Sequence, residues 1–156
     1  MNLIFRMIYV FLASFFKERL PPGATDSILK LRVLPNDLDI NLHVNNGRYL
    51  TLCDLTRIDL FIRTGLAKVM IKKRWTPIVA EHTMTYKKPL KVFQRFEMKL
   101  SLTHWDEKFF YMTHTFTRDG FTVAEGTSKG TVRARSGVVP PAEVIDAVKL
   151  SRQIRP

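Results

Sequence analysis

Carboxylates, amides and one imidazole crowd the segment 36–46, which follows a β-like segment and precedes a helical pattern. Ordering so many short polar side chains where a strand meets a helix is costly unless they bind or react with something. Asp39, Asn41 and His43 occupy alternate positions, so in an extended segment all three would point to one side. A carboxylate flanked by hydrogen-bond donors can activate water. The simpler alternative is a polar loop in which Asn45 or Asn46 caps the helix.

The apolar pattern predicts which elements hold this segment in place. We expect a strand over 28–34, a long helix from Gly47 to Gly65 that is covered on most sides, and a short helical stretch over 66–73. After Trp75 the residues alternate between apolar and polar, which predicts strands over 76–86, 96–103, 110–117 and 121–135. The fold class is therefore α+β: one long central helix wrapped by a curved antiparallel sheet of about five strands.

Both ends of the chain are expected to be helical. The segment 2–17 is apolar on all sides and would form a helix about 24 Å long, short of the ~30 Å hydrocarbon core of a membrane. We therefore interpret it as a docking helix or a peripheral membrane anchor. Small residues on one face of the last strand would let a helix approach closely. The expected division is an N-terminal helix (1–20), a main domain (24–139) and a short C-terminal helix with its tail (140–156).

The composition limits the partners. The net charge of +11 on 156 residues indicates an anionic partner, although a generally solvated basic surface is the alternative. The basic residues are dispersed and are not interleaved with aromatic residues in a recognisable motif, which disfavours nucleic acid. Cys53 is the only cysteine, so no intrachain disulfide is possible, and its place in a helical pattern favours a buried apolar role.

The histidines outside the polar segment show no spacing typical of metal ligands. His82, His104 and His114 lie on strand faces among apolar residues, which favours packed side chains. We therefore expect neither a metal nor a cofactor.

The run from Asp37 to Tyr49 resembles the D-x-D-x-N-x-H-V/M-N-N-x-x-Y segment of the acyl-ACP thioesterases, which have the hotdog fold. It is also similar to the corresponding segment of proteins like thioesterase superfamily member 6, and the loop aspartate of 4-hydroxybenzoyl-CoA thioesterases matches Asp39. The likeness covers roughly residues 28–135. It implies a hotdog fold and hydrolysis of an acyl thioester.

The resemblance implies a role for particular residues. It places Asp39 as base or nucleophile, with Asn41 and His43 beside it, although Asp39 could simply close an Asx-turn and His43 could serve only the helix entry. Related enzymes carry an acid directly before a tyrosine on the next strand, where this chain has Thr85, so Glu81 either substitutes for that acid or is a surface carboxylate. Backbone N–H groups of Asn46, Gly47 and Arg48 would polarise the thioester carbonyl. The substrate-binding candidates are Tyr49, Lys87, Lys88, Arg133 and Arg135.

Two functions of different classes remain open. The first is an acyl-CoA or acyl-ACP thioesterase of fatty acid metabolism that works as a homodimer or a dimer of dimers. The second is a non-catalytic acyl- or lipid-binding protein held at a membrane surface by residues 2–17. The intact polar loop favours the first, and the missing acid before Tyr86 favours the second. In either case we expect a cytoplasmic protein, peripheral at the inner face of the membrane.

Overall fold

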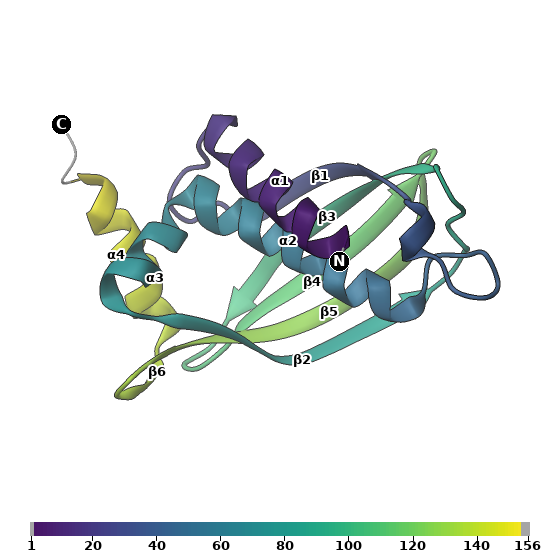
Figure 1. Cartoon of the computed structure of the whole chain (residues 1–156). Helices are drawn as coiled ribbons and strands as arrows, with labels where there is room; N and C mark the ends of the chain where they lie inside the picture. The colour runs from purple at the N-terminus through teal and green to yellow at the C-terminus, as the bar shows by residue number, and fades with distance from the viewer. Residues whose placement is uncertain (1, 154–156) are drawn as a thin grey trace.

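The protein folds around one helix, α2 (Asn46–Thr64), which lies in the curl of an antiparallel sheet (Figure 1). The computed structural model describes residues 2–153. The sheet order is β1-β3-β4-β5-β2, and a short strand β6 pairs with β5. The strands are β1 (Asp26–Arg32), β2 (Thr76–Tyr86), β3 (Arg95–Trp105), β4 (Phe110–Arg118), β5 (Phe121–Ala134) and β6 (Gly137–Val139). The predicted α+β class and the helix-in-sheet arrangement are confirmed.

Apart from shifts of a few residues at other element ends, three details differ from the sequence prediction. The first strand begins and ends two residues earlier than expected, because the chain leaves the sheet for a 3-10 turn at Pro35–Asp37. The strand β6 was not predicted at all. In β2, the register shifts between Val79 and Glu81, so the simple alternation of faces is interrupted at Ala80.

Local chemistry sets both ends of α2. The side chain of Asn45 accepts a hydrogen bond from the N–H of Gly47 at 2.9 Å, which satisfies one of the free donors of the first turn. At the other end Gly65 adopts a left-handed conformation with φ 86°, where a Cβ would be strained. The predicted cap and the predicted stop are therefore both confirmed.

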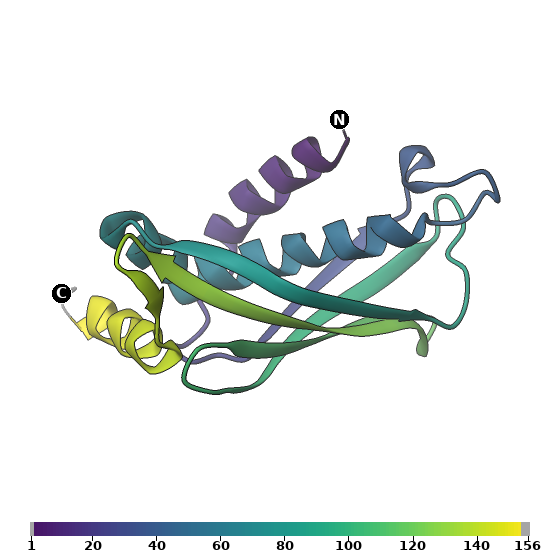
Figure 2. The same cartoon turned by 90° about the horizontal axis from the view of Figure 1, so that it is seen from below.

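The helices form a layer on one side and a cap at one end. Figure 2 shows α2 between the sheet and α1 (Asn2–Phe16), while α3 (Leu66–Lys73) and α4 (Pro141–Gln153) gather where α2 ends. The polar segment 36–46 lies at the opposite end of α2 in both views. The two ends of the central helix therefore face different surroundings.

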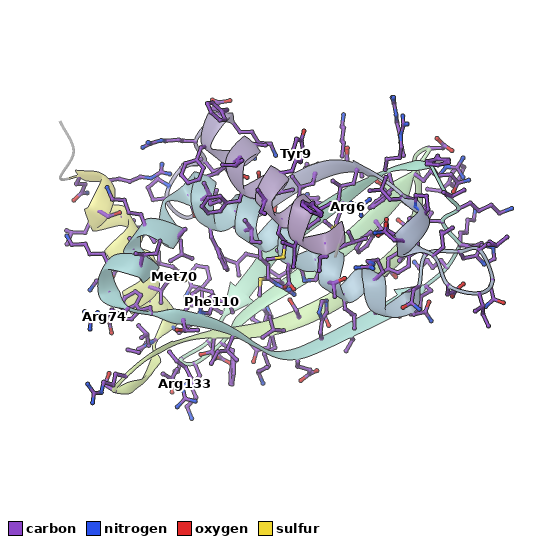
Figure 3. All side chains as sticks on the ribbon, viewed as in Figure 1. Arg6, Tyr9, Met70, Arg74, Phe110 and Arg133 are labelled. Atoms are coloured by element: carbon purple, nitrogen blue, oxygen red, sulfur yellow. The ribbon has the colours of Figure 1, made fainter. Side chains whose placement is uncertain are left out.

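The helix α1 turns its few polar side chains toward the protein. Arg6 pairs with Asp37 at 3.0 Å, and Ser14 donates to Asp59 at 2.8 Å, as does Lys17 directly after the helix. Arg6 and Tyr9 can be located on α1 in Figure 3. The outward face is apolar and exposed, and comprises Ile4, Phe5, Ile8, Tyr9, Phe11, Leu12, Phe15 and Phe16. Among the described residues, no helix combines the length and the apolar character needed to cross a membrane.

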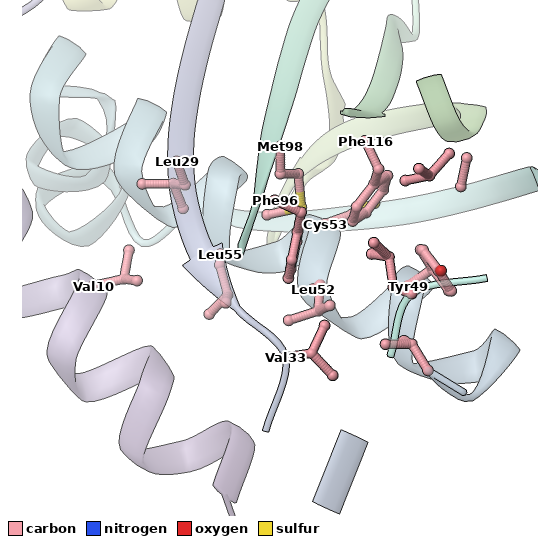
Figure 4. Packing of buried hydrophobic residues seen from close by; sticks show 14 residues of the cluster. Val10, Leu29, Val33, Tyr49, Leu52, Cys53, Leu55, Phe96, Met98 and Phe116 are labelled. Atoms are coloured by element: carbon pink, nitrogen blue, oxygen red, sulfur yellow. The ribbon is translucent and has the colours of Figure 1, made fainter. Parts of the chain in front are cut away.

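The core packs α2 against the concave face of the sheet. Leu52, Cys53 and Leu55 of α2 are fully buried beside Met98 and Phe116 of the strands (Figure 4). The small residues of β5 do allow a close approach, but not by a helix as predicted. A Cβ on Gly126 would lie 2.1 Å from the carbonyl oxygen of Thr83, so the neighbouring strand β2 occupies that space.

Candidate functional site

The segment 39–43 is a tight turn and not the extended segment in which Asp39, Asn41 and His43 would share one side. The N–H of Asp39 donates to the carbonyl of His43 at 2.8 Å, and the N–H of Asn41 donates to the Asp39 carboxylate at 2.8 Å. Leu42 adopts a positive φ of 59° to complete the turn. Asp39 therefore closes an Asx-turn, and the argument that alternate residues share one face does not apply.

The tip of this turn projects into solvent. Asp39 and His43 are half-buried and Asn41 is exposed. The apolar side chains between them are bare, with Ile40 97% and Leu42 71% exposed. Neither aliphatic side chain is covered by the rest of the protomer.

Asp37 holds the turn in place through its side-chain contacts, a role that the sequence prediction did not assign to it. Its buried carboxylate accepts from the N–H of Leu34 at 2.8 Å and pairs with Arg6 and Arg48. Asp37 thus links the turn to α1 and to the first turn of α2.

Two of the three backbone N–H groups predicted to bind an oxyanion at the start of α2 already donate a hydrogen bond. The N–H of Gly47 donates to the Asn45 side chain, and the N–H of Arg48 donates to the Asn45 carbonyl at 2.8 Å. Neither of these two hydrogen bonds uses the N–H of Asn46, the third predicted donor.

An apolar cavity of about 370 Å³ lies between the second half of α2 and the sheet. Figure 3 shows Met70 and Phe110, two of its lining residues, near the end of the molecule where α3 and α4 lie. Its wall also includes Ile58, Phe61, Ile78, Met112, Val132 and Val144. Its volume falls within the ~300–1,000 Å³ of ligand pockets. Asp39, Asn41 and His43 do not line it, so within one chain the polar turn and the cavity are separate.

Polar side chains gather beside this cavity, in a cluster that the sequence analysis did not predict. Asp54 and Arg57 of α2 form an ion pair, and both line the cavity. The second NH₂ group of the Arg57 guanidinium lies 3.3 Å from Nε2 of His114 on β4. The same Nε2 atom lies 2.8 Å from the hydroxyl oxygen of Ser128. Asp54 and Arg57 are three residues apart on α2, but His114 and Ser128 come from distant strands, so no spacing rule joins the cluster.

Burial shifts the pKa values of His114 and of the nearby Cys53. Burial, helped by the charges of Arg57 and His82, lowers the pKa of His114 to about 3, so the ring is neutral. Burial likewise raises the pKa of the Cys53 thiol to about 12. Cys53, predicted to be a buried apolar residue, and His114, predicted to be packed, are both confirmed as buried. His104 is instead exposed and stacks on Tyr111 at 4.3 Å between ring centroids.

Near this cluster, one sulfur and two ring nitrogens lie close enough together to bind a metal ion. The sulfur of Cys53 and ring nitrogens of His82 and His114 lie within 4.8 Å of one another. The guanidinium of Arg57 lies against His114, however, and a fixed positive charge there opposes a cation. The donor set therefore has the spacing for a metal but not the charge.

The remaining predicted residues are dispersed over the protomer. Glu81 is exposed on the outer strand β2, and Tyr49 is buried against Phe116 and Tyr86 at ring distances of 5.0 and 5.1 Å. The basic candidates fall into two groups. Lys87 pairs with Glu125 and Lys88 lies over Phe121. Arg133 is exposed opposite Thr76, the first residue of β2, and Arg135 is exposed two residues further on. Ten strand residues, roughly 30 Å, separate the two groups, so they cannot hold one phosphate group together within a protomer.

A second hollow, of about 820 Å³, is strongly basic. It lies between α1 and the strands β1, β3 and β4. Its cations are Arg6, Lys30, Arg32, Arg95 and Arg118, against Glu97 and Asp119. Tyr9 lines it and also belongs to the exposed apolar face of α1, so the two surfaces adjoin.

Residues 33–148 match the family model of the thioesterase-like superfamily. The chain belongs to the thioesterase-like superfamily. It is 32% identical over 121 residues to protein THEM6 of Danio rerio, covering 76% of this chain. It spans 60% of that relative and 45% of THEM6 from Xenopus laevis, so it matches about half of each curated protein.

Solved structures, among them that of a probable thioesterase, share the fold. The probable thioesterase YbaW from Escherichia coli superposes with a TM-score of 0.73 at 18% identity, covering 79% of this chain and 96% of YbaW. A Staphylococcus aureus protein solved in complex with CoA superposes with a TM-score of 0.69 at 15% identity, covering 85% of this chain and 88% of its own. These likenesses confirm the hotdog fold predicted from the polar segment.

Proposed function

We propose that this chain hydrolyses the thioester of an acyl-CoA or acyl-ACP, in keeping with a thioester hydrolase activity at the level of its family. The observation that carries the proposal is the apolar cavity between α2 and the sheet, which offers an acyl chain a largely uncharged wall. The CoA held by a structural neighbour supports CoA as the carrier. In fatty acid metabolism such a reaction would release a free acid.

Asp39 is the proposed general base. Its carboxylate would take a proton from water as that water attacks the thioester carbonyl; the tetrahedral intermediate then collapses and the thiolate leaves with the proton. Asn41 and His43 would orient the water or the carboxylate. The developing oxyanion would be met by the N–H of Asn46 at the start of α2, where the helix dipole favours negative charge.

The separation of Asp39 from the cavity within one chain supports a working site shared by two chains. The strand β2 is an outer strand with exposed side chains along nearly its whole length, and such an edge readily pairs with a second copy. In such a dimer the exposed side chains of Ile40 and Leu42 would contact the second copy, and Glu81 would lie at the interface. The proposed assembly is a homodimer, or a dimer of dimers.

Replacing Asp39 by asparagine or by alanine is expected to lower the hydrolysis of acyl-CoA at least about tenfold, or 1.4 kcal/mol of barrier. Asparagine keeps the oxygen that accepts from the N–H of Asn41, so it preserves the turn while removing the base. Steady-state assays over a series of acyl chain lengths measure the effect, with sedimentation of the same samples to verify the dimer.

Asp39→Asn with full activity would limit Asp39 to the turn and reject it as the base. A wild-type chain that hydrolyses no acyl-CoA or acyl-ACP would reject the hydrolase itself.

The exposed face of α1 favours a second candidate, an acyl- or lipid-binding protein held at a membrane surface. Eight apolar side chains face outward on one helix, beside a hollow lined by five cations. Apolar burial together with attraction to anionic lipids is how interfacial helices bind. Membrane contact through residues 2–17 is compatible with either activity.

The intact chain is expected to float with liposomes that contain phosphatidylserine, and Phe5→Ser/Phe15→Ser is expected to reduce the floating fraction several-fold. Both rings are exposed, so the change costs little in folding. The matched control is Phe121→Ser, an exposed ring on β5. Equal flotation of all three proteins would dismiss the helix as an anchor.

A further inference from the structure

Two arginines lie directly opposite each other in the basic hollow beside α1. Arg32 of β1 is the ladder partner of Arg95 of β3, and both residues are exposed and line the hollow. Side chains directly opposite on an antiparallel pair point to the same face, with Cβ atoms about 5 Å apart, and like charges in such a pair destabilise the sheet. The arrangement works against the stability of the sheet, so it calls for an explanation.

Two of the five cations of the hollow already have an anionic partner within the protein. The Arg6 guanidinium lies 3.0 Å from the carboxylate of Asp37, and that of Arg118 lies 3.2 Å from the carboxylate of Asp119. Asp37 also pairs with Arg48, so it has no charge to spare for a further cation.

The remaining three cations share one acid. Lys30 of β1 lies opposite Glu97 of β3, which is two residues from Arg95 on the same face. Among the described residues, no carboxylate forms an ion pair with Arg32 or Arg95. A single carboxylate against three cations leaves two positive charges unbalanced at this surface.

Contacts from α1 fix the position of the two arginines. Besides its ion pair, Arg6 donates a hydrogen bond to the backbone carbonyl of Arg32, which ties the end of β1 to the helix. Tyr9, labelled with Arg6 in Figure 3, lines the same hollow and is 68% exposed on the apolar face of α1. An anion held by the two arginines would therefore lie beside the side chains that are proposed to enter a membrane.

The excess charge indicates the class of anion. A phosphate monoester carries a charge of about −1.5 to −2 near pH 7, whereas a phosphate diester carries a single charge. Guanidinium groups bind phosphate oxygens through paired N–H donors. Two exposed arginines on one face thus match both the charge and the oxygens of one phosphate monoester.

We propose that Arg32 and Arg95 bind the phosphate monoester headgroup of an anionic membrane lipid. The inference rests on the second candidate function, membrane contact through α1, and adds the class of lipid that the protein selects. The apolar side chains of α1 supply affinity for any bilayer, and the two arginines supply the preference among headgroups.

The binding test uses phosphatidylcholine vesicles that contain either phosphatidic acid, a phosphate monoester, or phosphatidylserine, mixed to the same total surface charge. The proteins are the wild type, Arg32→Gln/Arg95→Gln and the control Lys68→Gln/Lys72→Gln. The control removes the same net charge from two exposed residues of α3, which does not line the hollow. Cosedimentation at a series of vesicle concentrations gives the affinities.

The wild type and the control are expected to bind the phosphatidic acid vesicles at least about tenfold more tightly than the phosphatidylserine vesicles. The change Arg32→Gln/Arg95→Gln is expected to abolish that preference. Phe5→Ser/Phe15→Ser is expected to weaken binding to both kinds of vesicle and to keep the preference. A wild type without preference, or an arginine variant with the wild-type preference, would overturn the proposal.

A soluble probe separates the headgroup site from membrane contact. Dihexanoyl phosphatidic acid, below the concentration at which it forms micelles, is titrated calorimetrically into the wild type and Arg32→Gln/Arg95→Gln, and the variant is expected to bind at least about tenfold more weakly. A wild type that binds this probe but no vesicle would reject membrane contact and keep the site. A wild type that binds vesicles but not the probe would reject the site and keep membrane contact.

Coenzyme A offers a phosphate monoester on a soluble carrier, and it is titrated in the same way. Binding of coenzyme A through the two arginines, without binding of dihexanoyl phosphatidic acid, would overturn the assignment to a lipid.

Unfolding without lipid provides a further test. Since Arg32→Gln/Arg95→Gln removes a repulsion between neighbouring strands, it is expected to unfold at the same urea concentration as the wild type or at a higher one. Unfolding at a clearly lower urea concentration would overturn the proposal, because the two arginines would then stabilise the sheet.

Discussion

The change Asp59→Ala is expected to lower the free energy of unfolding by about 3–5 kcal/mol. Asp59 lies on α2 and is fully buried. Its two oxygens accept from Ser14 of α1, from Lys17 directly after that helix, from Ser27 of β1 and from Arg63. Removing the carboxylate leaves two hydroxyls without their acceptor and two cations without their counter-charge. One substitution therefore loosens three elements at once.

The electrostatics of Asp59 agree with this role. Burial by itself raises the pKa of the carboxyl, but the hydrogen bonds from Lys17, Ser14 and the others outweigh it and hold the pKa below its ordinary value. A carboxyl with a lowered pKa stabilises the fold above its ordinary pKa near 4 and loses that contribution as the pH falls further.

Urea unfolding at neutral pH measures the effect. The control is Asp26→Ala on β1, which removes an exposed pair with Lys99 and is expected to cost less than about 1 kcal/mol. Equal losses for the two variants would show that burial of Asp59 does not matter.

Acid is expected to destabilise the protein through His114. Its pKa is about 3 in the fold, against an ordinary value near 6.5, so below pH 6.5 the unfolded chain binds a proton that the folded chain refuses. Stability is therefore intact above pH 6.5 and falls as the pH drops toward 3. At pH 5 the loss amounts to about 2 kcal/mol. His82, with its pKa also lowered by burial, acts in the same direction.

Denaturation of the wild type and His114→Gln at pH 7 and pH 5 isolates this contribution. The variant is expected to be less stable at pH 7 but to lose about 2 kcal/mol less between the two values. His104→Gln, on an exposed ring, should keep the wild-type dependence. Parallel losses in all three proteins would contradict a neutral buried His114.

The fold was largely predictable because its signals are local and periodic. Alternation of period two marks the long strands, and Asn45 and Gly65 mark the ends of α2. The inward side of α1 also left a signal that was not used. Arg6 and Ser14 fall on the face of the helix that docks, and Lys17 directly after the helix points the same way, to Asp59.

The site was less predictable because its parts meet only through long-range packing. Asp39 was predicted by resemblance, but the turn that it closes depends on Leu42 entering the left-handed region, which leucine rarely adopts. Arg57 and His114 come from a helix and a strand 57 positions apart. Nothing in the sequence near either residue indicates the other, so only the packed structure shows that they meet.

The orientation of α1 determines how the molecule would rest on lipid. Its hydrogen-bonding groups are fixed to Asp37 and Asp59 beneath it, so its rings form the outermost layer on the side away from the sheet. A bilayer that took up those rings would meet the protein broadside, with α2 lying flat beneath its headgroups. A fatty chain moving between lipid and cavity would then have to bend away from the membrane normal and travel sideways past the edge of that helix.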